Sequence, residues 1–105
     1  NILLTSKYTK KETYYITRKL YNLIRNDSYQ IIFKRLWGNI YGYYDGEDIV
    51  IDHRKDIIPT LIHECLHCWN EKWSETKVIE HERKIMNSLT PRQIRNIIRM
   101  LAKHL

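Results

Sequence analysis

Apolar residues follow a helical period in the first part of the chain. Ile16, Leu20 and Ile24 recur every four residues and lie on one side of a helix with 3.6 residues per turn. Just before them, Thr9 and Glu12 stand three residues apart in a capping box, in which each side chain satisfies a free backbone amide of the other residue. The pattern predicts an amphipathic helix from residue 10 to the turn-forming residues 26–28.

Residues 30–52 follow a different pattern. They are rich in β-branched and apolar side chains, and Gly38 and the pair Asp45-Gly46 interrupt them. An Asp-Gly pair between two apolar runs is typical of a tight hairpin turn, because few other residues tolerate positive φ angles. We therefore expect three short antiparallel strands, the last of them formed by residues 48–51.

Three more helices are expected after the strands. Asp56 precedes an apolar run with Pro59 in its first turn, where a missing amide hydrogen is tolerated, and this helix should reach about residue 73. Ser74 is expected to cap a second helix that ends near residue 89. Thr90 followed by proline opens a third helix, expected to run to residue 105. The predicted fold class is α+β, with an N-terminal helix, a small sheet and three C-terminal helices.

One domain of residues 1–105 is expected, because a chain of 105 residues has room for one hydrophobic core. No stretch reaches the roughly 18 consecutive apolar residues of a membrane span, so a soluble, cytoplasmic protein is expected. The net charge of +6 favours contact with phosphates, but the basic residues lie near the two ends of the sequence, with no aromatic-rich binding motif between them. We therefore do not expect nucleic acid to be the partner.

The chemistry is concentrated in His63, Glu64 and His67, which form a His-Glu-x-x-His sequence inside the apolar run. Residues four apart on a helix lie on neighbouring turns, so both imidazoles can reach one Zn²⁺ ion. Glu64 directly follows the first histidine and would lie beside a water molecule at the metal. This sequence is typical of zinc metalloproteases, in which the glutamate is the general base.

Zinc bound by two histidines alone is weakly held, so a third ligand is expected on the following helix. Glu80 points away from the apolar face of that helix, which leaves Glu75, His81 and Glu82. If the two helices formed an antiparallel pair turning near Trp73, residues equally far from the turn would face each other, which favours His81 and Glu82. Because imidazole is a common zinc ligand, the preferred metal ligands are His63, His67 and His81. Glu75 and Glu82 remain as alternatives.

The short chain, with its His63-Glu64-x-x-His67 helix between a small sheet and two further helices, resembles the minigluzincins, a family of minimal zinc metallopeptidases. These are similar to the catalytic domains of membrane-bound gluzincin peptidases but lack their membrane spans. The resemblance implies zinc-dependent peptide hydrolysis, a histidine as third ligand, which would fall on His81, and a C-terminal segment that maintains latency. The chain departs from the Glu-x-x-x-Asp pattern of the membrane-bound relatives.

We therefore expect a zinc-dependent metalloendopeptidase in which Glu64 acts as general base on a zinc-activated water. Its substrate would be a protein or peptide that pairs in extended form with an edge strand around Ile49, Val50 and Ile51. Residues 91–105 are expected to form a latency segment over the cleft of their own chain, or of a partner in a homodimer with exchanged C-terminal helices. The alternative is a basic nucleic-acid-binding or structural-zinc module without protease activity.

Overall fold

Helix α2 (Lys10–Arg25) begins at the predicted capping box. In the computed structural model, which describes residues 6–26 and 30–104, the Glu12 amide donates to the Thr9 hydroxyl at 3.1 Å and the Thr9 amide donates to the Glu12 carboxylate at 2.9 Å. Leu20 and Ile24 on the inner face are buried in the core. The predicted amphipathic helix is therefore confirmed, and its apolar stripe packs inward.

Strands β1 (Gln30–Phe33), β2 (Gly42–Tyr44) and β3 (Asp48–Ile51) form a mixed sheet in the order β1-β3-β2. The predicted hairpin joins β2 and β3 in antiparallel pairing, with Gly46 at φ +97° in its turn. β1 instead pairs with β3 in parallel, so the prediction of three antiparallel strands is wrong for β1. The loop of residues 34–41 leads from β1 to β2, which lies two strand positions away. The hairpin then places β3 in the gap between β1 and β2.

Buried Asp52 holds the loop between β1 and β2 in place. Its carboxylate accepts hydrogen bonds from the amides of Leu36 and Arg54, both at 3.0 Å, and from the Arg54 guanidinium at 2.8 Å. The Asp52 amide donates to the Tyr41 carbonyl at 2.8 Å. These contacts, above all the one with the Arg54 side chain, hold the pKa of the Asp52 carboxyl well below its usual range. The loop that leads into β2 is thus fixed by charge-assisted bonds.

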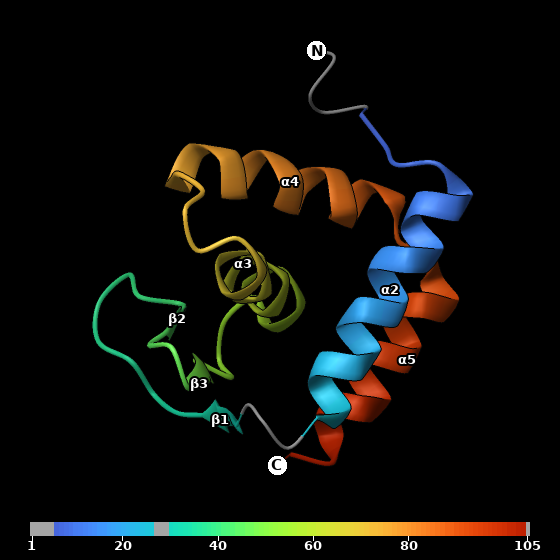
Figure 1. Cartoon of the computed structure of the whole chain (residues 1–105). Helices are drawn as coiled ribbons and strands as arrows, with labels where there is room; N and C mark the ends of the chain where they lie inside the picture. The colour runs from blue at the N-terminus through green and yellow to red at the C-terminus, as the bar shows by residue number, and fades with distance from the viewer. Residues whose placement is uncertain (1–5, 27–29, 105) are drawn as a thin grey trace.

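Helix α3 (Ile57–Trp69) lies between the sheet and the other helices (Figure 1). Leu61, Ile62 and Cys65 on its inner side are fully buried. Asp56 stands at the N-cap position as predicted, but its side chain makes no capping hydrogen bond. The helix ends at Trp69 rather than near residue 73. Its long apolar face makes α3 the central element of the core.

Helices α4 (Glu75–Ser88) and α5 (Pro91–Ala102) begin at the predicted caps, Ser74 and Thr90. In Figure 1, α3 is seen nearly end-on while α4 runs across the picture, so these two helices cross and do not form an antiparallel pair. Helix α5 lies beside α2, on the side of the molecule away from the sheet. Ile97 and Leu101 anchor α5 in the core.

The predicted α+β class is confirmed by these helices and the three-stranded sheet. Helix α5 ends at Ala102, and Leu105, to which the last helix was expected to run, lies outside the described residues. Within residues 6–26 and 30–104, no helix is both long and apolar enough to cross a membrane.

Candidate metal centre

Helix α3 presents His63 and His67 on neighbouring turns, with ring centroids 4.9 Å apart. The apolar residues Leu61, Ile62 and Leu66 occupy the inner face of the helix and are buried. Positions 63 and 67 therefore lie on a different face, where both imidazoles are only partly buried. The predicted pairing of the two histidines on one side of a helix is confirmed.

Glu75, the first residue of α4, completes a group of three potential ligands. Its Oε1 lies 2.5 Å from His63 Nε2, and its Oε2 lies 3.2 Å from His67 Nε2. One ligand atom from each of the three residues lies within 4.8 Å of the others. His63, His67 and Glu75 form the metal group: together these three residues could hold a metal ion.

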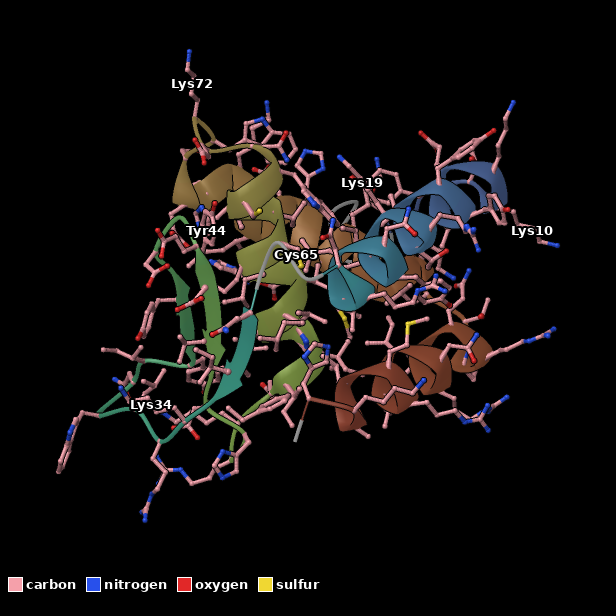
Figure 2. All side chains as sticks on the ribbon, turned by 60° about the horizontal axis from the view of Figure 1, so that its bottom comes forward. Lys10, Lys19, Lys34, Tyr44, Cys65 and Lys72 are labelled. Carbon is pink, nitrogen blue, oxygen red and sulfur yellow. The ribbon has the colours of Figure 1, made fainter. Side chains whose placement is uncertain are left out.

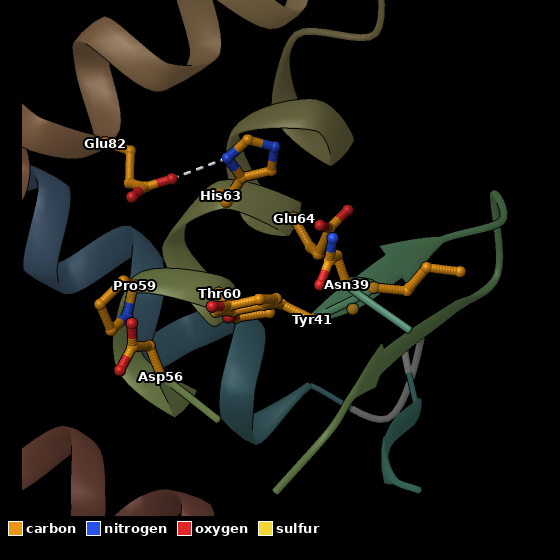
Figure 3. Close-up of a pocket in the computed structure, with 10 residues that line it drawn as sticks. Asn39, Tyr41, Asp56, Pro59, Thr60, His63, Glu64 and Glu82 are labelled. Atoms are coloured by element: carbon orange, nitrogen blue, oxygen red, sulfur yellow. Dashed lines mark hydrogen bonds and ion pairs between the residues drawn. The ribbon is translucent and has the colours of Figure 1, made fainter. Parts of the chain in front are cut away.

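A second carboxylate from α4 orients His63. Glu82 Oε1 lies 2.7 Å from His63 Nδ1, as the dashed line in Figure 3 marks. An ionised carboxylate only accepts hydrogen bonds, so this contact places a proton on Nδ1 and leaves Nε2 available for a metal. From the sequence, Glu82 is expected only as an alternative metal ligand. Its spacing of seven residues from Glu75, two helical turns, is the signal that could have predicted this role.

The donor set fits zinc. Imidazole nitrogens and carboxylate oxygens bind Zn²⁺ at about 2.0–2.2 Å, usually in a tetrahedron whose fourth position stays open in catalytic sites. Ligand atoms at such distances are about 3.3 Å apart, close to the 3.2 Å between His67 Nε2 and Glu75 Oε2. The 2.5 Å between His63 Nε2 and Glu75 Oε1 would have to lengthen by about 0.8 Å. A small movement of the exposed Glu75 side chain is sufficient.

His81, the ligand preferred from the sequence, is not part of this group. Its Nδ1 shares a hydrogen bond of 2.5 Å with Tyr8 Oη, and its ring packs on Trp73 with centroids 4.6 Å apart. Burial lowers the pKa of His81, and the charge of Lys84 lowers it further. The group that could hold a metal ion therefore contains Glu75, one of the alternatives drawn from the sequence, and not His81. The preference for His81 assumed antiparallel helices, whereas α4 crosses α3 and brings its first turn to the histidines.

Glu64 lies next to the metal group and is almost completely buried, with 8% of its surface exposed. Burial raises the pKa of its carboxyl, while the neighbouring His63 and His67 lower it. The hydrogen bond that His63 donates to Glu82 is the largest cause of the raised pKa of His63. A carboxylate with a raised pKa beside two imidazoles has the protonation chemistry of a general base.

A cleft lies between α3 and β2, and Glu64 lines it. The cleft consists of two hollows with volumes of about 440 Å³ and 550 Å³. Gly42, His63 and Glu64 line both hollows, so the metal group lies where they meet. The walls of the first hollow, drawn in Figure 3, include Tyr41 and Thr60. The second hollow extends along Tyr43, Tyr44, Gly46, His67, Glu71 and Glu75.

The rim of the cleft is β2 rather than β3. β3 lies between the other two strands, so the prediction that Ile49, Val50 and Ile51 form an edge strand is wrong. β2 approaches α3 closely at Gly42, where an added Cβ atom would lie 2.7 Å from Thr60 Cγ2. The absence of a side chain at Gly42 allows the edge strand to lie directly above the motif helix.

Helix α5 does not cover the cleft. Among the described residues, none from α5 lines either hollow, and the helix packs on α2 and α3 instead. The described part of residues 91–105 therefore does not lie over the cleft in this structure, and a latency role for this segment stays a prediction. The exchange of this helix between two chains stays a prediction.

The chain matches no protein-family model, no curated protein and no solved structure.

Proposed function

We propose that the chain is a zinc-dependent metallopeptidase. The observation that carries this proposal is the convergence of His63, His67 and Glu75 beside the buried carboxylate of Glu64, at the bottom of an open cleft. Two histidines and one glutamate are a ligand set of catalytic zinc sites with an open fourth position. A structural zinc site is usually closed by four protein ligands, so this arrangement favours catalysis.

His63, His67 and Glu75 would hold a zinc ion, which would supply Lewis-acid activation of a water molecule and polarisation of the scissile carbonyl. Glu64 takes the proton of the attacking water and transfers it to the leaving amine nitrogen. Glu82 accepts a hydrogen bond from His63 Nδ1 and so keeps that imidazole in the orientation that metal binding needs. Every residue in this scheme comes from α3 or α4.

The proposed substrate is a peptide in extended conformation. β2 is an edge strand of the sheet and forms the rim of the cleft, so an incoming strand could add to the sheet beside β2 and place one peptide bond near Glu64. The two hollows on either side of the metal group would receive side chains that flank this bond. Backbone pairing with β2 would provide affinity for peptides of many sequences.

The test is the substitution Glu64→Gln with Glu71→Gln as control. Glu71 is an exposed glutamate that lines the same cleft, so its replacement makes the same change without touching the metal group. Loss of a general base lowers the rate about 10²- to 10⁴-fold. We expect Glu64→Gln to keep zinc and to lose hydrolysis of fluorogenic peptides, whereas Glu71→Gln keeps both. Stoichiometric zinc without hydrolysis in the wild-type chain would instead favour a structural-zinc module.

A further inference from the structure

The charge of the chain is divided very unevenly between its parts. Residues 7–25 and 92–103 contain ten basic residues and one acidic residue, a formal charge of +9. The whole chain carries +6, so all remaining residues together carry −3. The basic character that the composition indicates therefore belongs to two segments at opposite ends of the sequence.

The fold brings these two segments together. α2 and α5 lie side by side and run in the same direction, on the side of the molecule away from the sheet (Figure 1). Asn96 donates to the Tyr21 hydroxyl at 3.4 Å, and the His104 ring donates to the Ile24 carbonyl at 2.8 Å. Two stretches of basic residues more than 60 positions apart thus become one surface.

The basic side chains occupy the outer faces of both helices. Lys11, Arg18 and Arg25 repeat every seven residues on α2, opposite the buried Leu20 and Ile24, and form a row about 21 Å long. The second row, about 16 Å long, follows α5 on the side opposite its buried residues and consists of Arg92, Arg95, Arg99 and Lys103. All seven residues are exposed. In Figure 2, nitrogen-tipped side chains project from both helices into solvent.

These charges are not neutralised within the part of the chain that the structure describes. The ion pairs found there involve Asp52 or the site histidines, and none is formed by a residue of α2 or α5. Glu12, the one acidic residue of the two segments, serves the α2 cap. The surface therefore has a strong positive potential that a polyanion can satisfy.

We propose that this surface, the α2–α5 face, binds the phosphate backbone of nucleic acid. Guanidinium groups match phosphate oxygens in bidentate geometry, and five of the seven residues in the two rows are arginines. Tyr14 and Tyr15 on α2 are 56% and 60% exposed and are available to stack on unpaired bases. A membrane-binding helix needs aliphatic or tryptophan side chains on the docking face, and the two rows contain none. Ile98, the exposed large aliphatic residue of α5, lines a separate hollow beside α3.

The α2–α5 face shares no residue with the metal group, so this binding is independent of the proposed hydrolysis. It also differs from the expectation drawn from the sequence, in which the two basic ends were treated as separate. A peptidase with such a face would act on proteins held near nucleic acid.

The experiment measures binding of fluorescently labelled DNA of about 20 nucleotides, single-stranded and duplex, by anisotropy between about 50 and 200 mM salt. The test variant replaces Arg18, Arg95 and Arg99 by glutamine. The control variant replaces Lys34, Arg35 and Lys72 by glutamine, which removes the same charge from exposed positions elsewhere. A third variant replaces the three test arginines by lysine. Circular dichroism and thermal melts check that all variants are folded.

We expect salt-sensitive binding by the wild-type chain and a loss of at least about tenfold in affinity for the glutamine test variant. The slope of log affinity against log salt should fall by about 2 to 3 in that variant, one for each lost phosphate contact. The control variant should stay within about twofold of the wild type, and the lysine variant should keep most of the affinity. Equal weakening by both glutamine variants, no DNA binding at low salt, or binding only to phosphatidylserine vesicles would overturn the proposal.

Discussion

Replacing Gly42 by alanine would put a methyl group into space that the structure already fills. Gly42 lies in β2, between the central strand and α3. An added Cβ atom would lie 2.6 Å from the Val50 carbonyl oxygen and 2.7 Å from Thr60 Cγ2. Both distances are shorter than real Cβ contacts, so either β2 or the residues beside it must move.

The size of the effect follows from which atoms are involved. Val50 O belongs to the backbone of β3 and cannot rotate away, and Thr60 is a buried residue of α3. Overpacking of this kind costs about 1–3 kcal/mol. For a domain of this size, each kcal/mol lowers Tm by roughly 4–8 °C. We therefore expect Gly42→Ala to lower Tm by roughly 5–20 °C and to move β2 away from the metal group.

Thermal unfolding of the wild type and of single and double variants tests this reasoning. Thr60→Ser removes Cγ2 and so relieves one of the two clashes, and the double variant Gly42→Ala/Thr60→Ser should recover part of the lost stability. Gly38→Ala is the matched control: nothing lies within 4 Å of its added Cβ, and its cost comes from a φ of +61° alone. Thr60→Ser should not rescue this control. Wild-type stability of Gly42→Ala, or no rescue by Thr60→Ser, would refute the steric argument.

Three further predictions concern Asp52, which fixes the loop before β2, the two cysteine thiols, and Glu82, the carboxylate that contacts His63. The pKa of Asp52 is lower in the folded chain than its unfolded-state value of about 3.9, so the ionised carboxylate stabilises the fold above that pH. This stabilisation is lost as the pH falls through the folded-state pKa. Asp52→Asn should therefore lower Tm by a similar amount from pH 8 to pH 5, with a difference from wild type that narrows only below about pH 4; a neutral effect at pH 7 would contradict this. Burial raises the pKa of the Cys65 thiol well above its ordinary value, so in the folded chain a thiol reagent should label only the partly exposed Cys68, and the Cys68→Ser variant should react only on unfolding. Glu82→Gln should weaken zinc binding about 10- to 100-fold, measured by competition with a chelator, whereas the same change at the exposed Glu80 should have no effect.

Local rules predicted the starts of α2, α4 and α5 because each of these caps involves residues only three positions apart. Thr9 with Glu12 and Thr90 with Gln93 form capping boxes, and Ser74 caps α4. The Asp45-Gly46 turn is equally local, and the hairpin predicted from it is the one that joins β2 to β3. Interactions of this range are encoded in short segments, so a single sequence is sufficient to find them.

The errors arose where distant segments decide the outcome. The position of β1 beside β3 depends on a loop held by Asp52, 16 residues after Leu36. The choice of Glu75 over His81 depends on the angle at which α4 crosses α3, which no pattern within either helix specifies. The union of two basic segments into the α2–α5 face likewise depends on packing between the ends of the chain.

The most direct test of the metallopeptidase account is metal analysis of the purified chain together with four folded variants. The account predicts one zinc per chain, lost in His63→Ala and His67→Ala, strongly weakened in Glu75→Ala and unchanged in His81→Ala, because His81 bonds to Tyr8 rather than facing the group. Absence of zinc from the metal-replete wild type, or loss of zinc in His81→Ala but not in Glu75→Ala, would contradict it.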